Sequence, residues 1–163
     1  MARLAYFPLI WAAMVLSTAW PAGWGVGGGR PDFALLLTVW FGLTLDRREA
    51  WFWGWGVGTA VDILSVGPVG PHGLLHLGLA LLLASKRRPW ELEGAAVRAG
   101  LAAAAALVVH AAEPVVVSKL AGQPAATAWA RAAGTALMTG LAALPVSAGL
   151  DRMLRPRRPR TVG

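Results

Sequence analysis

The chain has no cysteine and few charged residues. Without cysteine it can form no disulfide framework, no thiolate metal site and no cysteine nucleophile. Charged residues make up 14% of its 163 residues, where an ordinary soluble domain has about 25%. Apolar types reach 56% and the mean hydropathy is +0.56. This composition excludes most classes of soluble protein and predicts a polytopic membrane protein.

Apolar runs along the chain predict six membrane-spanning helices and no sizeable domain outside the membrane. The expected spans cover residues 4–20, 33–45, 50–66, 72–84, 95–119 and 129–150. A cleaved signal peptide is the alternative for the first run. Residues 91–98 could form a short amphipathic helix on the membrane surface. We therefore expect an all-α integral membrane protein, a bundle of six transmembrane helices over residues 1–150, followed by a basic cytoplasmic tail over residues 151–163.

Basic residues indicate how such a bundle is oriented. An even number of spans puts both termini on one side, together with Arg3, Arg47, Arg48, Lys86, Arg87, Arg88, Arg98, Arg152, Arg155, Arg157, Arg158 and Arg160. Only Arg30, Lys119 and Arg131 fall on the other side. The positive-inside rule then predicts that both termini are cytoplasmic. This orientation explains the net charge of +7, so we expect membrane lipids and no nucleic acid as partners of the basic tail.

Polar residues within the expected spans are candidate functional residues, because polar groups are costly at membrane depth. Asp62, His72, His76, His110 and Glu113 would all lie in the outer half of the membrane. Together they could form a metal or proton site. The favoured alternative is that the imidazoles are neutral and bond to backbone or interfacial water, so no metal or other cofactor is expected. For Asp62 a functional role and a role in capping the turn that follows are both open.

Small residues predict close packing between helices. Gly54 and Gly58 have the small-xxx-small spacing that lets two helix backbones approach, and residues 102–106 are all alanine. Each set could pack inside the chain or against a helix of a partner. Residues 23–28 match the letters of a dinucleotide fingerprint, but no strand is expected before them, so we reject that function. No spacing of serine, histidine and carboxylate suggests a nucleophile, and no catalytic residue is expected.

A longer motif starts with Pro31-Asp32-Phe33 before an apolar span. It continues with the Gly54, Gly58 and Asp62 spacing and ends in Gly67-Pro68-Val69-Gly70. Residues 31–84 thereby resemble the family of the rod shape-determining protein MreD. The resemblance assigns partner-binding or structural roles to Pro31, Asp32, Gly54, Gly58, Asp62, Gly67, Pro68 and Gly70.

What the resemblance implies is a non-enzymatic scaffold subunit of the bacterial rod-shape (elongation) complex in the inner membrane. Such a subunit binds the bitopic scaffold MreC, and it binds the peptidoglycan glycosyltransferase and transpeptidase that build the lateral wall. Members of the family are also thought to share their fold with the substrate-binding subunits of energy-coupling-factor transporters. The alternative is therefore a subunit that binds a vitamin or another small molecule. Asp62, His72, His76, His110 and Glu113 could line its pocket.

Overall fold

Six α-helices dominate the computed structural model, which describes residues 2–65, 68–86, 94–121 and 129–154. The helices are α1 (Tyr6–Ala19), α2 (Phe33–Thr44), α3 (Arg47–Leu64), α4 (Pro71–Lys86), α5 (Ala95–Ala121) and α6 (Trp129–Leu154). Short 3-10 helices cover Ala2–Ala5 and Ala22–Trp24. Within the described ranges the only β interaction is an isolated bridge between Val26 and Gly29. The expected all-α class is confirmed.

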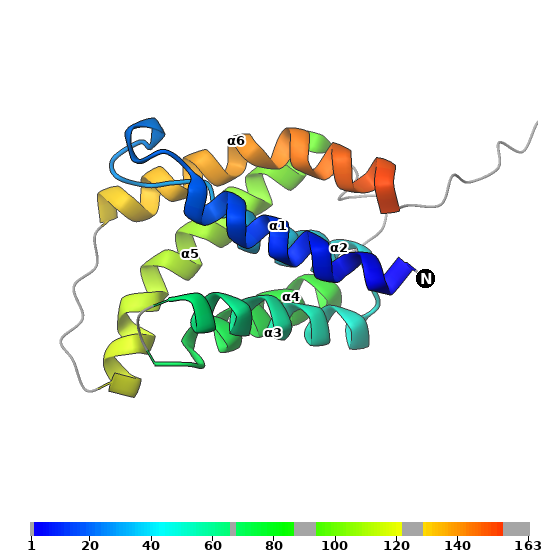
Figure 1. Ribbon diagram of the computed structural model, residues 1–163, viewed down its shortest axis with the longest axis horizontal. Coiled ribbons are helices and arrows are strands. Elements are labelled where there is room, and N and C mark those ends of the chain that lie inside the picture. Colours follow the sequence, from blue (N-terminus) through cyan, green and yellow to red (C-terminus); the bar gives the residue numbers. More distant parts are fainter. Residues whose placement is uncertain (1, 66–67, 87–93, 122–128, 155–163) are drawn as a thin grey trace, which may run out of the picture.

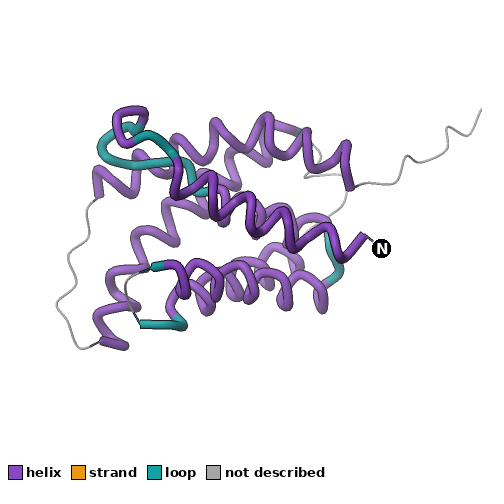
Figure 2. Tube along the Cα trace, viewed as in Figure 1, coloured by secondary structure: helices purple, strands orange, loops and turns teal. Residues whose placement is uncertain are grey.

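Successive helices run in opposite directions along the bundle (Figure 1). The start of α1 and the end of α6 lie at the same end, which we call the terminal end (Figure 1). The loop before α2 and the start of α4 lie at the opposite end, which we call the loop end (Figure 2). Helices α3 and α4 pack against each other, as do α5 and α6, and α2 contacts all the other helices. The chain is thus two helical hairpins arranged around α2.

Helix α2 is the centre of the core. Every residue from Ala34 to Gly42 is buried, as expected for a helix that is apolar on all sides. Phe41 of α2 meets the ring of Tyr6 from α1 at a centroid distance of 5.1 Å, and Tyr6 meets Trp53 from α3 at the same distance. Edge-on contacts of aromatic rings are favourable beyond their buried area. They join the first three helices.

Glycines set the distance between α3 and α4. A Cβ atom added to Gly58 would lie 2.3 Å from the carbonyl oxygen of His72, and one added to Gly54 would lie 2.6 Å from Cβ of Ala80. The predicted small-residue seam therefore lies between two helices of this chain. In the α5–α6 pair, a Cβ atom on Gly140 would lie 3.0 Å from Cβ of Ala103, so the alanine block also packs inside the chain.

Four helices begin or end outside the expected limits, and two of them, α3 and α6, do so by three residues or more. α3 starts at Arg47 rather than at residue 50, because Asp46 caps it by accepting the amide of Glu49 at 2.8 Å. α6 continues to Leu154, so the first four residues of the expected tail are helical. Both differences extend a helix by about one turn at the terminal end.

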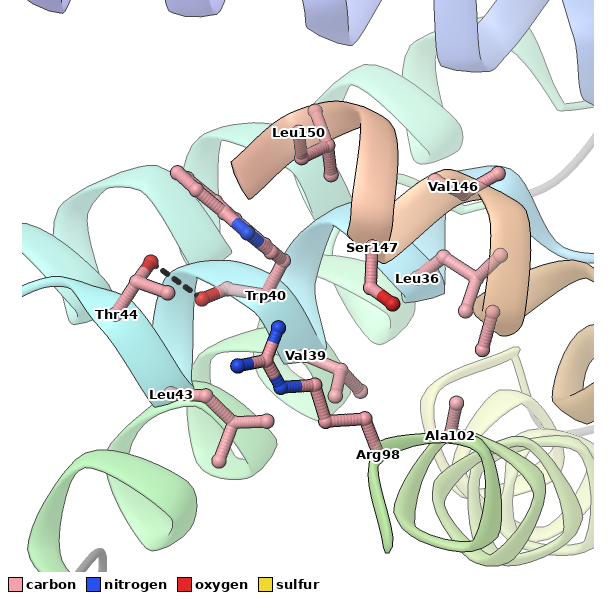
Figure 3. Close-up of a pocket in the computed structure, with 11 residues that line it drawn as sticks. Leu36, Val39, Trp40, Leu43, Thr44, Arg98, Ala102, Val146, Ser147 and Leu150 are labelled. Carbon is pink, nitrogen blue, oxygen red and sulfur yellow. Dashed lines mark hydrogen bonds between the residues drawn. The ribbon is translucent and has the colours of Figure 1, made fainter. Parts of the chain in front are cut away.

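The prediction of a surface helix over residues 91–98 is wrong in its last part. Residues 91–93 lie outside the described ranges. Residues 95–98 form the first turn of α5. The Arg98 side chain points towards Trp40 and Thr44 of α2, beside a cavity of about 20 Å³ (Figure 3). Arg98 pairs with Asp151 of α6, which also accepts the indole N–H of Trp40 at 3.1 Å. Asp151 thus connects α6 with Arg98 of α5 and Trp40 of α2, and the ion pair draws the Arg98 side chain away from the surface.

Two helices in the described ranges are long and apolar enough to cross a membrane, namely α5 over Ala95–Val116 and α6 over Trp129–Leu154. Three others are apolar but shorter, over Tyr6–Ala19, Phe33–Thr44 and Pro71–Ser85. By length and apolarity, these two helices are therefore compatible with a membrane protein.

Replacing Gly58 by alanine should destabilise the α3–α4 pair. The new Cβ atom would meet the backbone of α4, which must move away, and such overpacking costs about 1–3 kcal/mol. Gly56→Ala is the matched control on the same helix, because nothing lies within 4 Å of its Cβ position. It should be neutral or stabilising by up to about 1 kcal/mol through helix propensity. Thermal unfolding in detergent micelles, followed by circular dichroism, measures both. Equal melting temperatures for the two variants would contradict the close approach.

Candidate functional site

Five ionisable side chains form one connected network at the loop end of the bundle. His72 Nδ1 lies 2.8 Å from Asp62 Oδ1, and His72 Nε2 lies 3.3 Å from Glu113 Oε1. Glu113 Oε2 lies 3.2 Å from His110 Nδ1. His110 Nε2 lies 3.0 Å from Asp32 Oδ2. We call these five residues the carboxylate–histidine network. It links α3, α4 and α5 to the residue that precedes α2.

Asp62 is the deepest member, with 1% of its surface exposed. Its carboxylate accepts the backbone N–H groups of Gly70 at 2.9 Å, His72 at 3.0 Å and Gly73 at 2.9 Å. These amides belong to the first turn of α4 and the residue before it, so Asp62 caps α4 from the end of α3. Gly70 has φ +129°, a conformation that favours glycine. The structure thus shows the capping role for Asp62.

Asp32 ends the network on the other side and caps α2. Its Oδ1 accepts the N–H of Leu35 at 2.8 Å, and its own N–H donates to Thr139 Oγ1 of α6 at 2.9 Å. Its Oδ2 contacts the His110 ring, as given above. The dipole at the start of α2 favours a negative charge on this carboxyl group.

The four contacts of the network require bound protons. Each joins a ring nitrogen to a carboxylate oxygen, and a hydrogen bond between two such acceptors needs one hydrogen. Two neutral imidazoles supply only half of the hydrogens. A histidine that donates to carboxylates through both of its ring nitrogens is in the doubly protonated, charged form. Hydrogen bonds from such an imidazolium to carboxylates are charge-assisted and stronger than neutral ones.

Four of the expected polar residues meet in this network, but His76 does not. Its Nδ1 lies 2.8 Å from the hydroxyl of Thr38 on α2, and 1% of its surface is exposed. Asp32 was expected among the residues of the family motif and not in the polar cluster. The sequence signal for placing Asp32 near the cluster was its position at the start of an expected span, at the same end as Asp62. Among the described residues, no group of three or more His, Cys, Asp or Glu is placed to hold a metal ion.

A cavity of about 340 Å³ lies beside the network. Residues from all six helices and from the loop before α2 line it, and Asp32, His72 and His110 form part of its wall. Arg30 and Arg131 line it as well, and both are exposed. The volume is at the lower end of the range for small-molecule sites, about 300–1,000 Å³.

The loop that carries Arg30 lies directly on α6. The Gly29 N–H donates to the carbonyl of Val26 at 2.8 Å across a turn in which Gly27 and Gly28 have φ of +58° and +78°. A Cβ atom on Gly134 of α6 would lie 1.7 Å from the Val26 carbonyl oxygen. The glycine run therefore makes a tight turn against a helix, a geometry that agrees with the rejection of a dinucleotide fingerprint. The contact fixes this loop on the first turns of α6.

The remaining motif residues have structural surroundings or lie outside the description. Pro31 is fully buried, and Gly54 and Gly58 face α4 as described above. Pro68 belongs to the described part of the turn before α4, whereas Gly67 lies outside the described residues.

Comparisons of the chain with protein-family models, with curated proteins and with solved structures found no match. The similarity to the MreD family therefore rests on the motif residues alone. Function has to be argued from the geometry of the network, the cavity and the helix contacts.

Changing Asp62 should show how much the cap on α4 contributes. Asp62→Leu leaves three amides and one imidazole without their acceptor and should cost at least about 3 kcal/mol of stability, at about 1–3 kcal/mol per buried unsatisfied group. Asp62→Asn keeps one acceptor oxygen and should lose less.

Asp46→Asn provides the control for that experiment, because asparagine caps helices about as well as aspartate and Asp46 accepts only one described amide. Its unfolding in micelles should match the unchanged protein. An Asp62→Leu variant with unaltered stability would show that the cap is dispensable.

Proposed function

We propose that the chain spans the bacterial inner membrane six times, with both termini in the cytoplasm. The distribution of polar and apolar side chains supports this. Thr38, Asp62, His76, Thr135 and Thr139 are buried inside the bundle. Large apolar side chains cover its outside, among them Phe7, Trp11, Phe52, Leu74, Leu82, Val108, Leu137 and Leu141. Lipid is the solvent that suits such an exterior.

The short helices fit this arrangement when the loop end is included. The 12 residues of α2 rise about 18 Å at 1.5 Å per residue, whereas the hydrocarbon core is about 30 Å thick. Non-helical backbone at membrane depth is tolerated where it is buried in protein or lines a water-filled cavity. The loop before α2 lies on α6 and lines the cavity, so it satisfies that condition.

Charge also supports the orientation. Arg47 and Arg48 begin α3, Lys86 ends α4 and Arg152 lies near the end of α6, all at the terminal end. The basic residues of the loop end are Arg30, Lys119 and Arg131 within the described ranges. An excess of basic residues marks the cytoplasmic side.

For the function itself we propose a non-enzymatic scaffold of the rod-shape complex that binds MreC and the lateral-wall peptidoglycan synthases. The observation that carries this proposal is that the motif residues Gly54, Gly58, Asp62 and Gly70 act together in the α3–α4 hairpin. They hold the two helices close together while outward side chains, such as Trp55 and Leu74, stay exposed. A closely packed hairpin with an apolar exterior suits the packing of partner helices in lipid.

Reporter fusions test the topology. Fusions at Arg48, at Arg88 and at the C-terminus should report a cytoplasmic location, and fusions at Gly28 and Gly122 a periplasmic one. The reason is the charge asymmetry between the two ends. Alkaline phosphatase, which is active only outside the cytoplasm, and a fluorescent protein that matures inside it give opposite signals at each site. A periplasmic C-terminus would contradict the six-span arrangement.

Purification of the tagged chain from native membranes tests the scaffold function. We expect MreC and a peptidoglycan glycosyltransferase or transpeptidase to copurify, identified by mass spectrometry. Asp62→Leu should reduce their recovery through loss of the hairpin geometry, and Asp46→Asn should not. Copurification of an ATPase module without MreC would contradict the scaffold function and would support a transporter subunit.

That transporter subunit is the second candidate, and the cavity of about 340 Å³ is the observation that favours it. Substrate-binding membrane proteins hold their ligand in a concave site with a few convergent polar groups. Asp32, His72 and His110 converge on this cavity. Of the residues expected to line such a pocket, only His72 and His110 are part of its wall, whereas Asp62, His76 and Glu113 are not.

A further inference from the structure

We infer that the cavity at the loop end binds a small organic anion whose carboxylate or phosphate group is held between Arg30 and Arg131. The inference goes beyond the scaffold function. It also names a class of ligand for the second candidate function, the transporter subunit. In that role the inference rests on the transporter function. Its first support is that both arginines line the same cavity although they are 101 positions apart in the sequence.

One of the two arginines stands where a helix dipole disfavours a cation. Arg131 is in the first turn of α6, and a helix N-terminus carries partial positive charge. The start of α2 is capped by Asp32, so Arg30 contributes only its own charge. The backbone amides of α6 and the two guanidinium groups attract an anion with the same sign.

Both arginines also contradict the charge pattern of the rest of the chain. Among the Lys and Arg residues in the described part of the chain, three fall at the loop end, and two of these line this one cavity. Basic residues on the outer side oppose the favoured topology. A ligand that needs them there would account for both exceptions.

The carboxylates nearby are already engaged with other groups. Asp32 is the only acidic residue among the described residues that line the cavity, and its oxygens accept from Leu35 and His110. Glu113 and Asp62 contact the histidines of the network. No ion pair of Arg30 or Arg131 with a described carboxylate is formed, so their donors are open to a ligand.

The rest of the lining limits the kind of anion. Met14, Val61 and Leu64 give the cavity apolar wall, and Ser17 and Thr18 add hydroxyl groups. The planar donor fork of arginine matches carboxylate and phosphate oxygens. The cavity therefore suits an oxyanion attached to a small, partly apolar body. A free organic anion and the headgroup of an anionic lipid share this chemistry.

Titration of the purified full chain in phosphatidylcholine nanodiscs tests the inference. The probes are inorganic phosphate, glycerol 1-phosphate and glutarate, and isothermal titration calorimetry gives the dissociation constants. We expect saturable binding of at least one probe, weakened about tenfold or more by Arg30→Gln or Arg131→Gln, because charge-assisted hydrogen bonds are strong. Nanodiscs that contain phosphatidylglycerol distinguish the source: loss of probe binding there identifies a lipid headgroup, and unchanged binding identifies a free anion.

Two controls carry the same change of charge. Lys119→Gln alters the same end of the bundle outside the cavity lining, and Arg152→Gln alters α6 at its other end. Neither should change the dissociation constant. Asp32→Asn removes the negative charge from the cavity wall while keeping a capping oxygen, so it should strengthen binding of the anionic probes.

Three results would overturn the inference. The first is no binding of any probe in either kind of nanodisc. The second is an equal loss in Lys119→Gln. The third is weaker binding in Asp32→Asn at an unchanged melting temperature. The recovery of MreC with the tagged Arg30→Gln and Arg131→Gln variants is measured in parallel. Because neither residue belongs to the α3–α4 hairpin, that recovery should not change, and the scaffold function and the anion site can fail separately.

Discussion

The contact of Glu113 with two histidines is the interaction on which the loop end depends. One oxygen faces His72 and the other faces His110. His72 leads to Asp62, which caps α4, and His110 leads to Asp32, which caps α2. Two helix starts that are far apart in the sequence are thereby joined through a residue of α5. Without Glu113 the two caps would be separate, and each histidine would face a single carboxylate.

Burial of these charges is tolerable because each member of the network meets an opposite or polarised group. A carboxylate without partners is strongly disfavoured in an apolar interior. Asp62 has three backbone amides, and Asp32 has one amide and an imidazole. At the terminal end, Asp151 meets Arg98 and Trp40 in the same way. Polar contacts thus close the bundle at both ends, while small residues allow the helices to approach between them.

The sequence predicted the helices and part of the network, because those features depend on local patterns. Apolar runs gave all six helices to within about one turn, and the spacing of His110 and Glu113 placed them on one face. The position of Asp62 before a short glycine turn left a capping role open, and the structure shows it. Contacts that depend on how helices cross were not predictable in this way. Asp32 with His110, Arg98 with Asp151, and Gly134 against Val26 each require the tertiary arrangement.

The shortness of α2 accounts for the cavity and the network together. In the proposed membrane arrangement the 12 residues of α2 are too few to cross the hydrocarbon core, so α2 begins inside the bundle, where its first turn must find partners for its amides. Asp32 accepts one of them, that of Leu35, and its carboxylate also contacts His110, which in turn contacts Glu113. The loop above α2 cannot fill the remaining depth, since its glycine turn is bound to α6. The cavity lies beside that loop and the start of α2, and residues of the other five helices complete its wall. A central helix that begins inside the bundle thus brings its capping carboxylate to this wall.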